Sequence, residues 1–113
     1  LTYVSDTVDA FVRIAEAENT NGNVYNVGSN KEISIKELAG IIMKCLKRIA
    51  KIIQDKSRLR PEKSEVMQLV CDYGKIKSAC GWQPRISMDM GIELTCNWFK
   101  NYLDRYKPDI YNI

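Results

Sequence analysis

The chain has 113 residues, a formal net charge of +3, and 45% hydrophobic and 27% charged residues, a balance typical of one soluble globular domain. No apolar run reaches the roughly 18 residues that a membrane-spanning helix needs, and no charged-then-apolar signal segment opens the chain. We therefore expect a cytoplasmic protein. Because the chain begins at Leu1 rather than at Met and opens on a strand-like run, we also expect an excerpt of a longer polypeptide.

The sequence contains four cysteines and no histidine. None of the cysteines forms a Cys-x-x-Cys pair, and their spacing is too open for a zinc site with four thiolate ligands. Cys45 and Cys96 have apolar neighbours. We therefore expect no metal site, and free, mostly buried thiols in a reducing compartment.

Apolar residues near the N-terminus recur at the i, i+3, i+4 and i+7 spacing of one helical face: Val8, Phe11, Val12 and Ala15. This spacing predicts a helix over about residues 6–18 that buries the stripe, with Ser5 or Asp6 as its N-cap. A run of small polar residues then ends the helix, and residues 24–27 have the composition of a short strand. Gly28 permits a turn after that strand.

Ser34 followed by Glu37 has the spacing of a capping box and predicts the start of a second helix. The apolar stripe of this helix consists of Ile35, Leu38, Ala39, Ile42 and Cys45. The pattern leaves the end of the helix open, because residues 44–54 contain neither Gly nor Pro. We interpret residues 49–54 as a strand, and a helix that continues to Ile53 is the alternative.

Residues 58–66 form a polar segment between two apolar regions and combine two arginines with two glutamates. Pro61 lacks a backbone donor and favours an extended conformation at Arg60, which predicts a loop. Arg58 and Arg60 then project to the same side, and their planar guanidinium groups suit phosphate oxygens. The segment is therefore a candidate anion-binding site. The alternative is a solvated charged loop with internal Arg–Glu pairs.

Residues 66–71 are apolar enough for another short strand, and Asp72 is placed to cap a helix over residues 73–80. Gly81 would end this helix, because glycine adopts the left-handed conformation that commonly follows a last helical turn. We expect Trp82, directly after it, to belong to the core rather than to contact a ligand.

Ser87 predicts the start of a last helix with one broad apolar and aromatic face: Met88, Gly91, Ile92, Thr95, Trp98, Phe99 and Tyr102. A face of this width indicates deep burial or contact with a partner. Residues 107–113 show no pattern. We therefore expect residues 1–106 to form one lobe and residues 107–113 to form a loosely ordered tail.

Basic residues are concentrated between Lys44 and Lys63, where eight lysines and arginines face two acidic residues, a local charge of +6. Such a stripe is the basis of the alternative function, a small basic module that binds nucleic acid or a protein. The stripe contains no aromatic residue that could stack on bases, and most of its lysines fall on exposed helical positions. A solvated face is therefore the favoured interpretation, and we do not expect nucleic-acid binding.

Four motifs follow one another along the chain. They are LTYVSDTV at residues 1–8, VYNVGS at residues 24–29, Arg60-Pro61 followed by Glu65-Val66, and GWQP at residues 81–84 followed by Ile86-Ser87. In this order they resemble the C-terminal third of the extended short-chain dehydrogenase/reductase family, the NAD-dependent nucleotide-sugar epimerases and 4,6-dehydratases. The Arg-Pro followed by Glu-Val is most similar to the dehydratase branch, which includes the GDP-mannose 4,6-dehydratases.

The resemblance covers nearly the whole chain and implies a fold and a ligand. The fold would be α/β, a small substrate-binding lobe with short strands between amphipathic helices, and the Rossmann domain would lie outside this chain. The ligand would be a nucleotide-sugar. By the same resemblance Arg60 would contact the diphosphate, Arg58 would support it, and Glu65 would accept a ribose hydroxyl, with Glu62 as the alternative acid.

The resemblance also implies that the catalytic residues lie elsewhere. In the family a glycine-rich turn binds NAD, and a Tyr-x-x-x-Lys pair deprotonates the sugar 4-hydroxyl. We expect both in an upstream Rossmann lobe, which would bind NAD or NADP, and we expect this chain alone to bind no cofactor and to contribute no catalytic residue. The whole enzyme would be a 4,6-dehydratase or a 4-epimerase, and a homo-oligomer.

Overall fold

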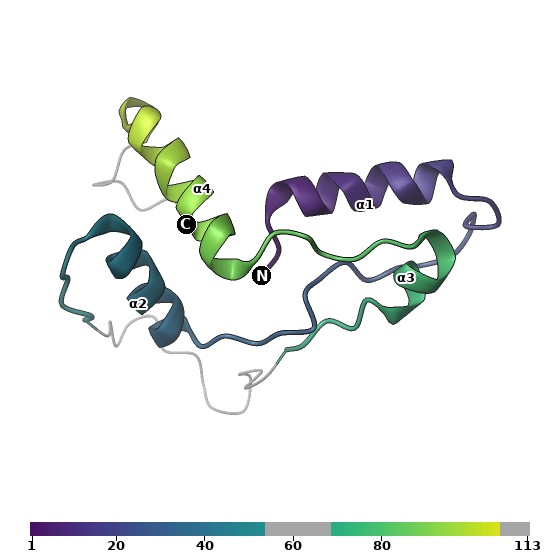
Figure 1. Ribbon diagram of the computed structural model, residues 1–113, viewed down its shortest axis with the longest axis horizontal. Coiled ribbons are helices and arrows are strands. Elements are labelled where there is room, and N and C mark those ends of the chain that lie inside the picture. Colours follow the sequence, from purple (N-terminus) through teal and green to yellow (C-terminus); the bar gives the residue numbers. More distant parts are fainter. Residues whose placement is uncertain (54–68, 107–113) are drawn as a thin grey trace.

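The computed structural model describes residues 1–53 and 69–106, and in this part of the chain it contains four α-helices and one short 3-10 helix (Figure 1). The helices are α1 (Val4–Glu16), α2 (Ile35–Leu46), α3 (Gly74–Cys80) and α4 (Met88–Asn101), and the 3-10 helix is η3 (Leu103–Arg105). α1 packs against α3 and α2 packs against α4, so the helices form two pairs that extended segments connect. None of these helices is long and apolar enough to span a membrane.

The core lies between α1 and α3 and is built on Ala10, Ile76 and Trp82. Trp82 is only 1% exposed, which confirms the prediction that it belongs to the core. Tyr73 packs beside it, and the two rings meet edge to face with centroids 5.9 Å apart. The extended segment at residues 25–27 covers another side of the cluster. The first helix pair therefore holds the buried centre of the described fold.

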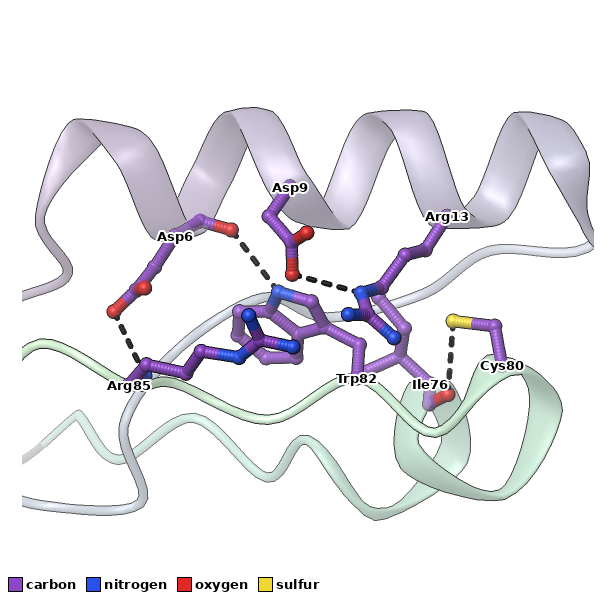
Figure 2. A network of polar contacts seen from close by, with 7 residues as sticks. All are labelled: Asp6, Asp9, Arg13, Ile76, Cys80, Trp82 and Arg85. Atoms are coloured by element: carbon purple, nitrogen blue, oxygen red, sulfur yellow. Dashed lines mark hydrogen bonds and ion pairs between the residues drawn. The ribbon is translucent and has the colours of Figure 1, made fainter.

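Asp6 connects the first turn of α1 to the segment that follows α3 (Figure 2). Its backbone carbonyl accepts a hydrogen bond of 3.0 Å from the indole N–H of Trp82. One carboxylate oxygen, Oδ2, accepts the backbone N–H of Arg85 at 3.1 Å. The same oxygen accepts the backbone N–H of Ile86 at 3.0 Å. Asp6 is 5% exposed, and the two N–H groups on its carboxylate offset the cost of burying the acid, whereas the Trp82 bond is made by the Asp6 backbone.

The structure confirms a helix near the N-terminus but corrects its cap and its buried face. The N-cap is Tyr3, without a side-chain bond, so Ser5 and Asp6 lie inside the helix. The predicted stripe faces solvent: the side chain of Phe11 is 73% exposed, and Val8 and Val12 are about half exposed. The face that contains Asp6 and Ala10 is buried instead, because a small alanine lets the helix approach Ile76 and Trp82 closely.

α2 begins with the predicted capping box. The Ser34 hydroxyl accepts the Glu37 backbone N–H at 3.1 Å, and the Glu37 carboxylate accepts the Ser34 backbone N–H at 2.9 Å. Bonds from the Ser34 hydroxyl and backbone also hold the pKa of Glu37 below its usual value. The helix ends at Lys47, whose φ of 51° is left-handed. Residues 48–53 form neither the predicted strand nor the alternative helix, and residue 54 lies outside the described part.

The described residues contain no β-strand, so the expectation of short strands between helices is wrong for residues 24–27 and 69–71. Both segments are extended, but a strand needs a ladder of backbone bonds to a neighbour. The two segments are instead connected by single bonds. Asn30 donates its backbone N–H to the Cys71 carbonyl at 3.2 Å, and the Asn30 side chain accepts the Tyr73 backbone N–H at 3.1 Å.

The boundaries of α3 and α4 follow the predicted signals closely. Asp72 accepts the Gly74 backbone N–H at 2.7 Å, although Tyr73 is the N-cap residue, and Gly81 ends α3 with a φ of 71°. The Ser87 hydroxyl accepts the Met90 backbone N–H at 3.3 Å, as expected of an N-cap. Local side-chain chemistry therefore determines where these two helices begin and end.

The broad face of α4 is buried over its first half only. On this face Gly91 is buried and Ile92 and Thr95 are half-buried, whereas Trp98 and Phe99 are 45% and 39% exposed. The exposed aromatic rings contact each other and the ring of Tyr106. The expectation of deep burial therefore holds only where α4 meets α2.

We predict that Asp6→Ala destabilises the protein by about 2 kcal/mol, because two part-buried N–H groups lose a charged acceptor. Asp6→Asn should cost less, since a single oxygen accepts both bonds and an amide oxygen can replace it without the charge. Urea unfolding monitored by circular dichroism measures both changes.

The matched control for this prediction is Asp9→Ala in the same helix. Asp9 pairs with Arg13 at 2.8 Å near the surface, and removing such an i, i+4 pair should cost no more than about 0.5 kcal/mol. Equal losses for Asp6→Ala and Asp9→Ala would show that the Asp6 bonds do not hold the two segments together.

Candidate functional site

A cavity of about 520 Å³ lies between the N-terminal residues, α2 and α4. Its apolar wall comes from α2 and α4: Leu38, Ile42, Met88, Ile92 and Thr95. Its polar groups come from the connecting segments: Ser29, Lys31, Tyr73, Arg85 and Ser87. An apolar wall with a few converging polar groups is the usual composition of a small-molecule site. We therefore take this cavity as the candidate functional site.

Asp6 and Gly91 shape one end of the cavity. Asp6 fixes the backbone of Arg85 and Ile86, and both residues line the cavity. Gly91 lets α4 approach the N-terminal segment, since a Cβ there would lie 3.4 Å from the Cβ of Tyr3 and 3.6 Å from Cγ2 of Ile86. A larger side chain at this position would therefore enter the cavity or displace its wall.

Gly28 shapes the opposite side, where the segment at residues 24–30 meets Cys71. A Cβ at Gly28 would lie 2.5 Å from both Cβ and Sγ of Cys71, a distance that no real pair of atoms tolerates. This close approach places the next residue, Ser29, in the wall of the cavity.

Ser29 has a buried hydroxyl for which the described residues offer no hydrogen-bond partner. A buried hydroxyl without a partner costs about 1–3 kcal/mol, so native proteins rarely leave one in that state. Other atoms of Ser29 line the cavity, and a ligand with a polar atom at this wall would remove the cost by drawing the buried hydroxyl toward the cavity.

Two cations, Lys31 and Arg85, lie at the cavity with exposed side chains. Neither takes part in an ion pair within the described residues. Ammonium and guanidinium groups offer several donors to phosphate or carboxylate oxygens, so an anionic group at the opening of the cavity would find two opposite charges.

The four cysteines are free thiols, as predicted, but they are not mostly buried: Cys96 is buried and the other three are half-buried. Cys96 on α4 is 8% exposed, and burial raises the pKa of its thiol, with the neighbouring Cys45 on α2 acting in the same direction. A raised pKa keeps the thiol protonated and poorly nucleophilic at neutral pH. The described residues also contain no group of three or more potential ligands that could hold a metal ion.

The site residues predicted from the sequence, Arg58, Arg60 and Glu65, lie outside the described residues, as does the alternative acid Glu62. Their roles therefore stay predictions. The part of the basic stripe that the structure describes, Lys44 to Lys51, has exposed lysines and an exposed arginine on and after the last turn of α2. The exposure agrees with a solvated face and does not test binding.

One pair of residues in the chain matches the spacing of the family's catalytic pair. Tyr73 and Lys77 do have the Tyr-x-x-x-Lys spacing. The structure gives the tyrosine a packing role, because Tyr73 is the N-cap residue of a seven-residue helix and its ring packs edge to face on Trp82. Lys77 is exposed in the last turn and does not line the cavity. The spacing alone therefore does not identify a catalytic pair here.

The sequence did not single out Ser29, Lys31, Arg85 or Gly91 as site residues. The available signal was indirect: Ser29 ends the VYNVGS motif, and Arg85 lies between the GWQP motif and Ile86-Ser87. Both motifs bring backbone from distant parts of the chain to one cavity.

The chain matches the family model described as GDP-mannose 4,6 dehydratase over residues 1–95. It is 33% identical over 101 residues to a UDP-N-acetyl-alpha-D-glucosaminuronate decarboxylase of Bacillus cytotoxicus, covering 88% of this chain and 31% of that protein. It is 34% identical over 99 residues to a putative UDP-glucose 4-epimerase of Methanocaldococcus jannaschii, covering 88% of this chain and 30% of the relative.

A third relative is a dTDP-D-glucose 4,6-dehydratase of Mus musculus, 27% identical over 110 residues, which are 93% of this chain and 30% of that protein. The chain thus spans about 30% of the length of these relatives and matches their C-terminal part. No solved structure matches the chain.

We predict that Gly28→Ala destabilises the protein by about 2 kcal/mol or more, because its methyl group would overlap Cys71. Gly40→Ala in α2 is the control, since a Cβ there meets nothing within 4 Å and alanine favours the helix. Thermal unfolding measures both. Adding Cys71→Gly should recover most of the loss, and no recovery would mean that the overlap with Cys71 is not the cause.

Proposed function

Because the chain belongs to the GDP-mannose 4,6 dehydratase family, we propose that it forms the nucleotide-sugar-binding part of an NAD- or NADP-dependent 4,6-dehydratase or 4-epimerase. The observation that carries this proposal is the cavity beside α2 and α4, with an unpartnered Ser29 hydroxyl in its wall and two cations at its opening. The relatives named after UDP-, dTDP- and GDP-linked sugars support the same class of ligand.

The cavity suits the chemistry of such a ligand. A nucleotide-sugar combines a flat or puckered ring system that packs on apolar side chains, hydroxyl groups that need hydrogen-bond partners, and a diphosphate with negative charge. Leu38, Ile42 and Ile92 offer the apolar surface, Ser29 offers a hydroxyl, and Lys31 and Arg85 offer positive charge. Each part of the ligand would therefore find a matching group.

The arginine segment would complete the site. In this proposal Arg60 holds the diphosphate and Arg58 supports it. Glu65 accepts a ribose hydroxyl, and Glu62 is the alternative acid. The support for these roles is the Arg-Pro motif and its resemblance to the family, together with the bidentate geometry of guanidinium and phosphate.

The remaining parts of the enzyme would lie in the N-terminal part that the relatives have and this chain lacks. That part would bind NAD or NADP, whose nicotinamide supplies the hydride chemistry, and would provide the catalytic base. This chain would then bind and orient the substrate without being catalytic alone. We further propose a homo-oligomeric enzyme of the cytoplasm.

Ser29→Ala tests the cavity in a chimera that places this chain behind the N-terminal part of the Bacillus cytotoxicus decarboxylase. The free protein should become more stable by about 1 kcal/mol, because an unpartnered buried hydroxyl is removed. Binding of UDP-glucose, dTDP-glucose or GDP-mannose should weaken by about tenfold for whichever of them binds, because a hydrogen bond to the ligand is lost. Thermal unfolding and calorimetric titration measure the two effects.

Ser78→Ala on the exposed surface of α3 is the control: it should leave ligand affinity unchanged and raise stability by no more than about 0.5 kcal/mol, the gain in helix propensity. A gain in stability with unchanged ligand affinity would place the nucleotide-sugar away from Ser29. Tight binding of an oligonucleotide by the same protein, without binding of any nucleotide-sugar, would favour the basic module instead.

Arg60→Ala in the same chimera should weaken nucleotide-sugar binding by about 2–3 kcal/mol, on the order of 30- to 150-fold, because a bidentate bond to phosphate is lost. Arg60→Lys should be intermediate, since lysine keeps the charge but not the planar fork. Arg58→Ala should be the milder alanine variant, and NAD affinity should hardly change. Calorimetry with nucleotide-sugar and with NAD checks all three variants, and unchanged sugar-nucleotide affinity in Arg60→Ala would assign the loop to the solvated surface.

A further inference from the structure

α1 carries apolar residues on two opposite faces. Its inner face, with Asp6 and Ala10 buried and Ile14 half-buried, packs on the core. Its outer face presents four large apolar side chains to solvent: Val4 at 63%, Val8 at 55%, Phe11 at 73% and Val12 at 49% exposure. We call these four residues the outer face. At 100° per residue they lie within one stripe, and the inner face lies on roughly the other side of the helix.

The outer face holds the larger side chains, although the inner face is the one that the described fold covers. A helix that is apolar on opposite sides is typical of a position between two layers of structure. Within the described residues only one of those layers is present, in the form of α3 and Trp82. The sequence pattern of α1 therefore fits a second layer that residues 1–53 and 69–106 do not supply.

The length and position of the match indicate what that second layer is. The chain corresponds to the C-terminal part of relatives that are about three times longer. In these longer relatives, an N-terminal part precedes the region that matches this chain. That part would connect to the chain at Leu1, immediately before α1. Leu1 is itself 64% exposed and also lines the cavity. A preceding domain would thus enter beside both the outer face and the cavity.

The aromatic patch on α4 is a weaker candidate for the same partner. Trp98, Phe99 and Tyr106 already contact one another, with ring centroids 4.8–6.0 Å apart. No such aromatic cluster covers Val4, Val8, Phe11 and Val12 in the part of the chain that the structure describes.

We propose that the outer face of α1 is the docking surface for the N-terminal, cofactor-binding part of the enzyme. The inference rests on the proposed function in one respect, the existence of that longer enzyme. The contact sets the position of the cavity relative to the bound cofactor, because the same N-terminal segment joins α1 to the cavity wall.

Cysteine labelling tests the docking surface. Phe11→Cys should react readily with a maleimide in the 113-residue chain and at least tenfold more slowly in the chimera with the Bacillus cytotoxicus N-terminal part. Ser78→Cys, on the exposed side of α3, is the control and should react within about twofold of the same rate in both proteins. Peptide mass mapping separates these sites from the four native thiols.

If the chimera does not fold, a second measurement replaces the labelling. The tagged N-terminal part and this chain are then produced as separate polypeptides, and co-purification is compared for the unaltered chain, Phe11→Glu and Ser78→Glu. We expect Phe11→Glu alone to reduce co-purification at least tenfold. Equal recovery of all three chains would overturn the proposal.

Two further outcomes of the labelling would also be decisive. Equal reactivity of Phe11→Cys in the chain and the chimera would overturn the proposal. Protection that develops in the chain alone as its concentration rises would do the same and assign the outer face to contact between two copies of this chain. Protection in a chimera that binds no nucleotide-sugar would retain the docking surface while rejecting the proposed function.

Discussion

The described fold depends on Asp6, through both its buried carboxylate and its backbone carbonyl. Three hydrogen bonds from Trp82, Arg85 and Ile86 converge on one residue in the first turn of α1, across a sequence separation of 76–80 residues. These bonds close the chain between its first helix and the segment that leads into α4. Because the same segment forms one wall of the cavity, a single buried acid both holds the core together and positions the candidate site.

The sequence predicted well those features that depend on neighbouring residues. The capping box of Ser34 and Glu37, the cap at Ser87 and the end of α3 at Gly81 all rely on bonds or backbone angles within a few residues. Trp82 was correctly assigned to the core, because a large aromatic side chain directly after a helix end is expected to pack against the neighbouring helices. The resemblance to nucleotide-sugar epimerases and dehydratases was also confirmed, since it depended on the order of several motifs.

Features that depend on a distant surface could not be predicted in the same way. Periodicity showed that α1 has an apolar stripe, but it could not show which face meets Ile76 and Trp82, and the covered face uses a small alanine. The segment at residues 24–27 is not a strand, because a strand needs a paired neighbour, and the backbone bond to Cys71 comes from Asn30, three residues beyond the expected strand. Likewise Ser29 and Gly91 became site residues only through folding, and Tyr73 acquired a packing role that its spacing to Lys77 does not reveal.

The division of the helices into two pairs determines which parts of the protein a ligand in the cavity would contact. The buried core lies with α1 and α3, whereas α2 and α4 pack on each other, and the cavity is lined by the N-terminal segment next to α1, by Tyr73 next to α3, and by both helices of the second pair. A molecule bound there would touch both pairs at once. Its binding free energy would then add to the stability of the folded protein, because the ligand would connect the two helix pairs.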